Sequence, residues 1–212
     1  ILKSAQSLDG KIALQNGESN WITNSESRKN SHRIRSGVKG ILIGRNTAEQ
    51  DNPSLTVRLT KNDLGLDKGE AIQQPVKIIL GNLKNSKKVS KIFSGNSKII
   101  IGSKQSAKKS KTVEYLEYKK KNFLKEFLQD LLDRNISSIL VEGGQKTLNA
   151  FIVNNLFDEL VLYTAPMFLG EGSIDALSVD SPNAIRTAMK LKMVRVEKFK
   201  EDIKTTYYNK RL

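Results

Sequence analysis

Cysteine is absent from this sequence of 212 residues, and His32 is its only histidine. Without cysteine there is no disulfide, no thiolate nucleophile and no cysteine-ligated zinc. A single histidine excludes a histidine-rich metal centre and a relay between two histidines. No apolar run approaches the roughly 20 residues of a membrane-spanning helix, and no signal-like apolar stretch opens the chain. These absences predict a cytoplasmic protein that works without a metal and without a membrane.

Acidic side chains are few relative to basic ones, 22 against 36, which gives a formal net charge of +14. Such a surplus attracts anions, so nucleic acids, membrane surfaces and phosphorylated small molecules are all candidate partners. Most of the surplus is lysine in polar segments, which is typical of a solvated surface, and these segments carry no nucleic-acid-binding motif. The charge therefore identifies no partner by itself.

Short β-rich runs alternate with helical patterns, as in an α/β sheet covered on both faces. The length and the 38% hydrophobic content are those of one domain with a substantial core. The last two runs alternate at period two and predict an antiparallel hairpin. Strands are expected at 1–8, 11–14, 40–44, 76–80, 97–102, 137–142, 158–165, 191–199 and 203–212.

Helical periodicity is readable in three segments, 23–37, 122–134 and 145–156. The first opens with Thr23-x-x-Glu26, a capping-box pattern in which Thr23 would cap the helix. Residues 45–75 are expected to form a loop, and the polar segments 61–75 and 103–121 to be irregular or mobile.

Glu142 ends an apolar run and is followed by Gly143-Gly144, directly before a predicted helix. Backbone N–H groups at a helix start hold phosphate oxygens, and glycine permits the close approach. A plain tight turn, with Glu142 as a charge partner of the helix start, explains the same residues equally well. The dinucleotide fingerprint G-x-G-x-x-G and the P-loop are both absent. A nucleotide here therefore requires a fold other than an ordinary Rossmann unit.

Three features near the N-terminus are also notable. Lys3 lies inside the apolar first strand, where a lysine either extends to the sheet edge or stands near a reacting centre. Asp9-Gly10, between two strand-like runs, predicts a hairpin turn. Trp21 is the only tryptophan, and its polar neighbours argue against full burial, although core packing is the commoner role.

Arg28, His32 and Arg35 share one face of the first predicted helix. Arg58 follows the loop DNPSLTV, where Pro53 holds the preceding residue extended at the carboxyl edge of the sheet. Two arginines on separate elements are able to bind one phosphate, although each alone is more often a surface charge. His32 is interpreted as a packing or hydrogen-bonding residue.

The motifs SLDGKIA, GESNWIT, ILIGRNTAEQDNPSLTVR, ILVEGGQKTLNAF and LFDELVLYTAPMFLG occur in this order. In this combination the chain resembles, over essentially its whole length, the reductase domain of the bifunctional riboflavin-biosynthesis deaminase/reductase. The resemblance implies a dihydrofolate-reductase-like α/β fold, with a mixed, mostly parallel sheet, helices on both faces and a C-terminal antiparallel hairpin. It also implies NADPH-dependent reduction of the ribosyl group of 5-amino-6-(5-phosphoribosylamino)uracil to a ribityl chain, and a homodimer.

The same resemblance implies roles for individual residues, and Lys3 matches a lysine that the family needs for activity. From the chemistry of the implied reaction, we expect Lys3 and Glu142 to polarise or protonate the opening sugar, and Asp51 to position the nicotinamide ribose or the substrate. Substrate contacts are expected at Ser19, Arg35, Leu55, Arg58 and Glu142. Cofactor contacts are expected at Ala5, Trp21, Thr47, Asp51, Asn82, Gly144, Gln145, Lys146, Thr147, Leu148, Asn149 and Ala150. Asn82 departs from the family pattern, which usually has Asp-Ser after this strand.

The family's deaminase half needs zinc held by histidine and cysteine, which this chain does not provide. The missing initiator methionine favours a reductase half removed from a longer chain. A stand-alone reductase acting on the undeaminated diaminopyrimidine precursor is the alternative. A dihydrofolate reductase proper, a basic nucleic-acid-binding domain and a scaffold without activity are the rival hypotheses.

Overall fold

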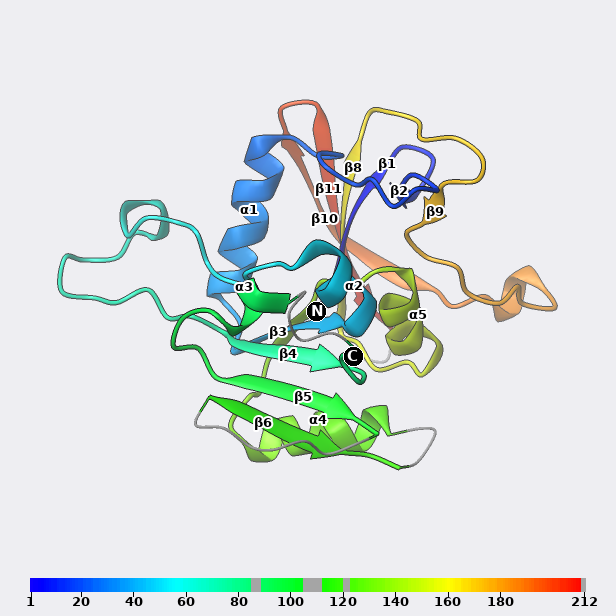
Figure 1. The fold of residues 1–212 in the computed structure, drawn as a ribbon. Helices are drawn as coiled ribbons and strands as arrows, with labels where there is room; N and C mark the ends of the chain where they lie inside the picture. Colours follow the sequence, from blue (N-terminus) through cyan, green and yellow to red (C-terminus); the bar gives the residue numbers. More distant parts are fainter. Residues whose placement is uncertain (85–88, 105–111, 120–122, 211–212) are drawn as a thin grey trace. The chain divides into compact units, whose positions relative to one another are not determined.

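A computed structural model describes residues 1–84, 89–104, 112–119 and 123–210. The chain forms two compact units (Figure 1). Residues 1–28 and 142–212 make the first, called here the terminal unit, and residues 29–141 make the second, called the central unit. Some of the predicted strands lie in the terminal unit and the others in the central unit.

The central unit contains a parallel sheet. Its strands lie in the order β7-β3-β4-β5-β6, and every neighbouring pair is parallel. All residues of β3 and β5 are buried, as their uninterrupted apolar runs predict. The strands are β3 (Gly40–Gly44), β4 (Val76–Leu80), β5 (Ile99–Ser103), β6 (Val113–Glu117) and β7 (Ile139–Val141).

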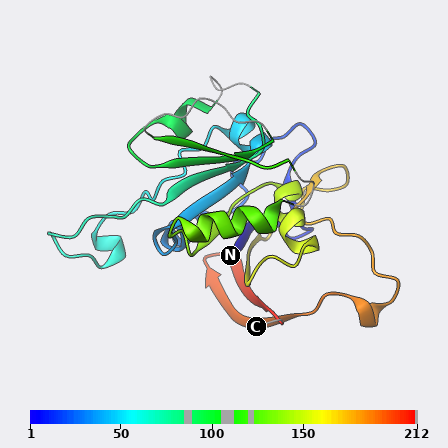
Figure 2. The same ribbon diagram turned by 90° about the horizontal axis from the view of Figure 1, so that it is seen from below.

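Helix α4 (Leu124–Asp133) packs against the strands of this unit through its apolar stripe (Figure 2). Phe127 is fully buried, and a Cβ added to Gly102 of β5 would lie 2.6 Å from the Phe127 ring. Glycine at this strand position therefore lets the aromatic ring lie directly on the sheet. The other helical segments of the unit are α2 (Arg45–Asp51), a 3₁₀ turn (Asn62–Leu64) and α3 (Ser90–Phe93).

The terminal unit contains a mixed sheet with the order β10-β11-β8-β1. Strand β1 pairs with β8 in parallel, whereas β11 pairs antiparallel with both β8 and β10. The predicted closing hairpin and the mixed, mostly parallel sheet are thus confirmed. The strands are β1 (Leu2–Ser7), β8 (Glu159–Ala165), β10 (Leu191–Phe199) and β11 (Asp202–Asn209); the unit also holds β2 (Lys11–Ala13), β9 (Ile174–Asp175), α5 (Gln145–Val153) and a 3₁₀ turn (Ile185–Thr187).

Helix α1 (Ser25–Ser36) begins with a different cap from the predicted one. The side-chain oxygen of Asn24 accepts hydrogen bonds from the backbone N–H groups of Glu26 and Ser27, at 2.9 and 3.1 Å. The expectation that Thr23 caps this helix is therefore wrong. Asn24 is itself held by Phe199 and Asp202, and such distant partners are invisible in a local capping pattern.

Three other local expectations are wrong. The segment 45–75 was expected to be a loop but begins with helix α2, and the polar segment 103–121 contains strand β6. The turn at Asp9-Gly10 forms, with Gly10 at φ +75°, but the strands that it joins do not pair with each other. Strand β2 pairs with β9 instead. Within the described ranges, no helix has both the length and the apolar character needed to cross a membrane.

Candidate functional site

Lys3 lies close to a buried tyrosine in the terminal unit. Its Nζ is 5.9 Å from the ring centroid of Tyr163, whose side chain is 1% exposed. The register explains the contact: Ala5 pairs with Tyr163, and Lys3 stands two residues before Ala5 on the same face of the sheet. Of the two roles open to a lysine in this strand, the contact favours placement at a site over extension to an edge.

Charged groups surround the Tyr163 hydroxyl. Burial, and next the carboxylates of Glu197 and Glu142, raise the Tyr163 pKa above its ordinary value. Lys204 Nζ lies 2.8 Å from Glu197 Oε2 in the neighbouring strand pair. The buried tyrosine therefore keeps its proton, and Glu197, one of the two carboxylates, forms an ion pair with Lys204.

The start of helix α5 offers backbone N–H groups to an anion. Gly144 is the N-cap, has no side-chain cap, and accepts hydrogen bonds at its carbonyl from Thr147 and Leu148. The first turn contains no acidic residue and does contain the exposed Lys146. These residues fit a nucleotide phosphate. Gly143 has a different role, because a Cβ there would lie 2.5 Å from the Thr147 Cβ.

Trp21 is exposed, with 67% of its surface accessible, so it is not a core residue. The Arg28 guanidinium carbon lies 4.4 Å from its ring centroid, and Arg28 Nη1 donates to the Thr23 carbonyl. This stacked pair offers a flat face of the kind on which planar ligand groups bind. Ser19, two residues before Trp21, is half-buried.

In the central unit, residues 55–58 form a segment outside the helices and strands, called here the Arg58 arm. Leu55 and Val57 are buried, whereas Arg58 is exposed. Leu55 has φ +51°, an uncommon conformation for a bulky residue that is held here by its burial. The sequence gives no sign of this backbone turn.

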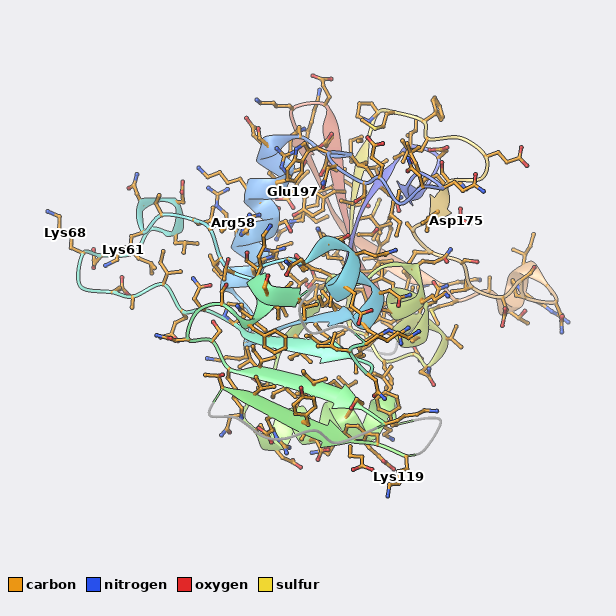
Figure 3. The ribbon with its side chains drawn as sticks, in the orientation of Figure 1. Arg58, Lys61, Lys68, Lys119, Asp175 and Glu197 are labelled. Carbon is orange, nitrogen blue, oxygen red and sulfur yellow. The ribbon has the colours of Figure 1, made fainter. Side chains whose placement is uncertain are left out.

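The Arg58 arm is held from both sides by side chains. From α1, Arg35 Nη1 donates to the Thr56 carbonyl at 3.0 Å, and His32 Nδ1 accepts from the Arg58 backbone N–H at 3.1 Å. From the other side, the Gln74 amide accepts from the Val57 N–H at 2.9 Å and donates to the Val57 carbonyl at 3.2 Å. Arg58 lies beside α1, as Figure 3 shows.

Asp51 ends helix α2 and is exposed, but the protein atoms around it still raise its carboxyl pKa by desolvation. The next residue, Asn52, has φ +42° and accepts at Oδ1 from the Lys91 N–H at 2.9 Å. This bond ties the end of α2 to the start of α3. Thr47, one turn before Asp51, is half-buried.

Asn82 follows β4, at the position where the sequence departs from the family's Asp-Ser pattern. Its Oδ1 accepts from the Lys104 backbone N–H at 3.0 Å and so links the ends of β4 and β5. Nearby, Glu49 Oε1 accepts from the Lys84 N–H at 2.5 Å. Asn82 therefore has a structural partner for its carbonyl group.

Comparison with families of known proteins matches residues 1–205 to the family described as the RibD C-terminal domain. The chain belongs to this family. It is 37% identical over 209 residues to the riboflavin biosynthesis protein RibD of Aquifex aeolicus, covering 95% of this chain and 55% of that protein. It is 31% identical over 212 residues to RibD of Haemophilus influenzae, covering 97% and 57%. The chain thus spans little more than half of these RibD proteins.

Solved RibD structures have the same fold. Acinetobacter baumannii RibD superimposes with a TM-score of 0.84 at 27% identity, over 98% of this chain and 56% of that one. The Thermotoga maritima protein described as a deaminase/5-amino-6-(5-phosphoribosylamino)uracil reductase gives 0.81 at 29% identity, over 98% and 55%. The fold class predicted from the RibD-like motifs is therefore confirmed, and the chain is a reductase-family domain of riboflavin biosynthesis.

The predicted site residues gather in groups within each unit of this RibD domain. In the terminal unit, Lys3 and Glu142 both act on Tyr163; in the central unit, Arg35 and Arg58 both belong to the network around the Arg58 arm. Arg28, in the terminal unit, stacks on Trp21. Sequence reasoning missed Tyr163, Glu197, Lys204 and Gln74. The pairing of β1 with β8 points to Tyr163 once the register is known, whereas nothing local marks Gln74.

Proposed function

We propose that residues 1–212 act as one reductase domain that uses NADPH to convert the ribosyl group of 5-amino-6-(5-phosphoribosylamino)uracil to a ribitylamino chain. Membership of the RibD C-terminal family and the description of the Thermotoga maritima relative support this substrate. The observation that carries the proposal is the position of Lys3 Nζ over the ring of Tyr163, a buried residue whose pKa the Glu142 carboxylate also raises, so that both proposed catalytic groups interact with one tyrosine.

The reaction requires proton transfers that this chain's residues are able to provide. The sugar opens when its ring C–O bond breaks and the ring oxygen takes a proton, while the attached nitrogen loses its proton as a C=N bond forms at the former anomeric carbon. NADPH, when bound, would supply the hydride that this carbon accepts, and the nitrogen then takes a proton to give the amine. Lys3 and Glu142 are the groups that deliver or withdraw these protons, and both interact with the buried Tyr163. Asp51, with its raised pKa, positions the nicotinamide ribose or the substrate.

Arg35 and Arg58 bind the substrate phosphate in this proposal. Arg58 belongs to the Arg58 arm and Arg35 donates to its Thr56 carbonyl, and guanidinium groups match phosphate oxygens in charge and geometry. Ser19 and Leu55 contact the rest of the substrate. The exposed Arg58 is the member of this set with the clearest access to a ligand.

Cofactor contacts are proposed in each unit by itself: at the start of α5 and on β1 in the terminal unit, and on α2 in the central unit. The helix start, Gly144 with Lys146, takes a phosphate, and exposed Trp21 offers a flat face. Asn82 contributes through its amide nitrogen, because its carbonyl oxygen accepts from Lys104. The remaining contacts proposed are Ala5, Thr47, Asp51, Gln145, Thr147, Leu148, Asn149 and Ala150.

The test is the loss of NADPH absorbance with the deaminated pyrimidine and, in parallel, with its undeaminated precursor. Turnover of the deaminated compound supports the proposal. Preference for the precursor supports the alternative, a stand-alone reductase that acts on the pyrimidine before it is deaminated. Oxidation with neither compound contradicts both. Residues 1–212 contain no cysteine, so they lack the zinc ligands of the family's deaminase half.

The phosphate role is tested by Arg58→Ala. Removal of a charge-assisted hydrogen bond costs about 1.5–3 kcal/mol, so KM for the phosphorylated substrate should rise by about ten- to a hundredfold. Lys68→Ala is the matched control, because it removes one positive charge from the loop of Lys61 and Lys68 (Figure 3). Equal changes in the two variants would show that Arg58 acts only through net charge.

We also propose that the chain forms a homodimer through β10. Among the described strands, β10 pairs only with β11, so one of its edges has no strand partner. Its apolar side chains Met193 and Val196 are 58% and 57% exposed. Exposed apolar edges of this kind mark association surfaces. Sedimentation of the wild type and of Val196→Lys checks this: a dimer that the substitution dissociates is expected, and a monomeric wild type contradicts it.

A further inference from the structure

The only histidine of the chain lies against the Arg58 arm. His32 is 8% exposed and faces Arg58 with both ring nitrogens. Nδ1 is 3.1 Å from the Arg58 backbone nitrogen, and Nε2 is 3.3 Å from the Arg58 Nε and 3.2 Å from Nη2. A buried side chain is thus in contact with both the backbone and the guanidinium of the proposed phosphate ligand.

The two contacts cannot both be hydrogen bonds of a neutral ring. A neutral imidazole carries one N–H and one acceptor nitrogen, whereas the Arg58 backbone N–H and guanidinium are donors only. The backbone donor has a fixed direction, because the two residues directly before it, Thr56 and Val57, are held by side-chain hydrogen bonds. The backbone bond therefore takes precedence, Nδ1 is the acceptor, and Nε2 carries the proton.

This tautomer has a consequence for the guanidinium. In the structure Arg58 Nε is placed to donate to His32 Nε2, at 3.3 Å, and Nη2 lies 3.2 Å from the same nitrogen. With the proton on Nε2 these groups become opposed donors, which is unfavourable, so the guanidinium turns from the ring towards any anion that offers oxygen acceptors. The other tautomer would do the reverse: it would bind the guanidinium and release the backbone.

We propose that His32 is a positioning residue for Arg58. Its neutral, Nε2-protonated ring fixes the Arg58 backbone and directs the guanidinium to the phosphate of the substrate. Gln74 assists from the opposite side by binding both backbone groups of Val57. The inference rests on the proposed function for the identity of the ligand, but the tautomer and the fixed backbone are properties of the protein alone.

The first experiment reads the tautomer directly. Because the chain has one histidine, the two imidazole nitrogens of a ¹⁵N-labelled protein without a histidine tag give signals that need no assignment by mutation. A protonated Nε2 and an acceptor Nδ1 near neutral pH are expected. A protonated Nδ1, or a ring with both nitrogens protonated, would overturn the proposal.

The second experiment measures binding of ribose 5-phosphate. His32→Leu removes the acceptor and should weaken binding about five- to tenfold, the usual worth of one neutral hydrogen bond and its unsatisfied donor. His32→Asn should restore most of the affinity, because asparagine Oδ1 reaches the place of Nδ1. NADPH affinity should stay within about twofold in both variants, since the loss concerns only the phosphate ligand.

A general loss of stability is controlled by Ile100→Val, which removes one methyl group from a fully buried residue of β5. This variant should bind ribose 5-phosphate as the wild type does. Equal weakening by His32→Leu and His32→Asn, or a parallel loss of NADPH affinity, would reduce His32 to a packing residue. If the wild type binds ribose 5-phosphate but reduces neither pyrimidine, the proposed reaction fails, whereas the inference about His32 is still judged by these two experiments.

Discussion

Lys3 Nζ lies 5.9 Å from the ring centroid of Tyr163, on the face of β1 and β8 that also carries Ala5. The ring is buried, and the carboxylates of Glu142 and Glu197 raise its hydroxyl pKa. An ammonium group near an aromatic face is stabilised by the ring's electrons. The Tyr163 ring therefore holds the proposed catalytic lysine, and the Tyr163 hydroxyl takes no part in this contact.

Two substitutions of Tyr163 separate these functions. Tyr163→Phe keeps the ring, so kcat should stay within about threefold of the wild type. Tyr163→Leu removes the ring and a contact of about 0.5–2 kcal/mol, so kcat should fall by up to about thirtyfold more. Steady-state kinetics with the deaminated pyrimidine measures both. A large loss in Tyr163→Phe would show instead that the hydroxyl takes part in proton transfer.

Lys3 and Glu142 should affect turnover far more than NADPH affinity. Lys3→Met and Glu142→Gln are expected to lower kcat by about 10²–10⁴, the range for a positioned acid or base, while NADPH Kd changes less than about threefold. Single-turnover kinetics and fluorescence titration with NADPH provide the two numbers. If turnover and affinity fall by the same factor, neither residue has the assigned catalytic role.

Gly143→Ala should disturb the start of α5. The new Cβ would lie 2.5 Å from the Thr147 Cβ, a contact that real structures avoid, so the helix start must move. Overpacking of this kind costs about 1–3 kcal/mol. We expect a lower Tm and weaker NADPH binding, because the proposed phosphate contacts belong to the same turn. Calorimetry and NADPH titration measure the two effects.

The double variant Gly143→Ala with Thr147→Gly is the matched control for this clash. It removes the Cβ that the new methyl group would meet, so it should behave like Thr147→Gly alone in both measurements. If Gly143→Ala is as harmful in the Thr147→Gly background as in the wild type, the cause is the backbone of Gly143 rather than its packing.

Several strands were predictable because their residues carry the signal themselves. Gly40–Gly44, Val76–Leu80 and Leu191–Phe199 occur at the predicted bounds. The apolar runs of the first two reflect their burial, whereas the third is marked by its alternating sequence although most of its residues are exposed. Strand β6, at Val113–Glu117, is rich in polar residues and forms because β5 offers it a parallel edge. Helix α2 was not predictable in the same way, because Ala48 is its only buried residue and the helix has no apolar stripe.

In the candidate site, too, some residues were predictable from local motifs and others were not. Motifs predicted Lys3, Glu142 and Arg58, and the structure supplies their neighbours through register and hydrogen bonds. Tyr163 acts on Lys3 only because β1 pairs with β8, and Gln74 acts on Val57 across 17 residues of chain. Such relationships have no local spacing, so periodicity and turn chemistry do not reveal them.

Asp9 provides a prediction about acid stability. Its carboxylate accepts hydrogen bonds from the Ser7 hydroxyl and from the backbone N–H groups of Leu169 and Gly170, at 2.5, 3.2 and 2.8 Å. The Ser7 bond, followed by the backbone bonds, lowers the Asp9 pKa from 3.8 to about 2. The folded protein therefore binds a proton at Asp9 less readily than the unfolded chain does.

The sign of the pH dependence follows from this lowered pKa. Stabilisation by Asp9 is fully present above the unfolded value of 3.8 and is lost as the pH falls through about 2. Asp9→Asn should therefore lower the free energy of unfolding at pH 6, and its stability should fall less steeply than that of the wild type below pH 4. Urea unfolding at a series of pH values measures both curves.

Asp180→Asn, which changes an exposed carboxylate of the same unit, shows what loss of one negative charge does by itself. Parallel curves for the wild type and Asp9→Asn would mean that the three hydrogen bonds of Asp9 do not distinguish the folded from the unfolded chain.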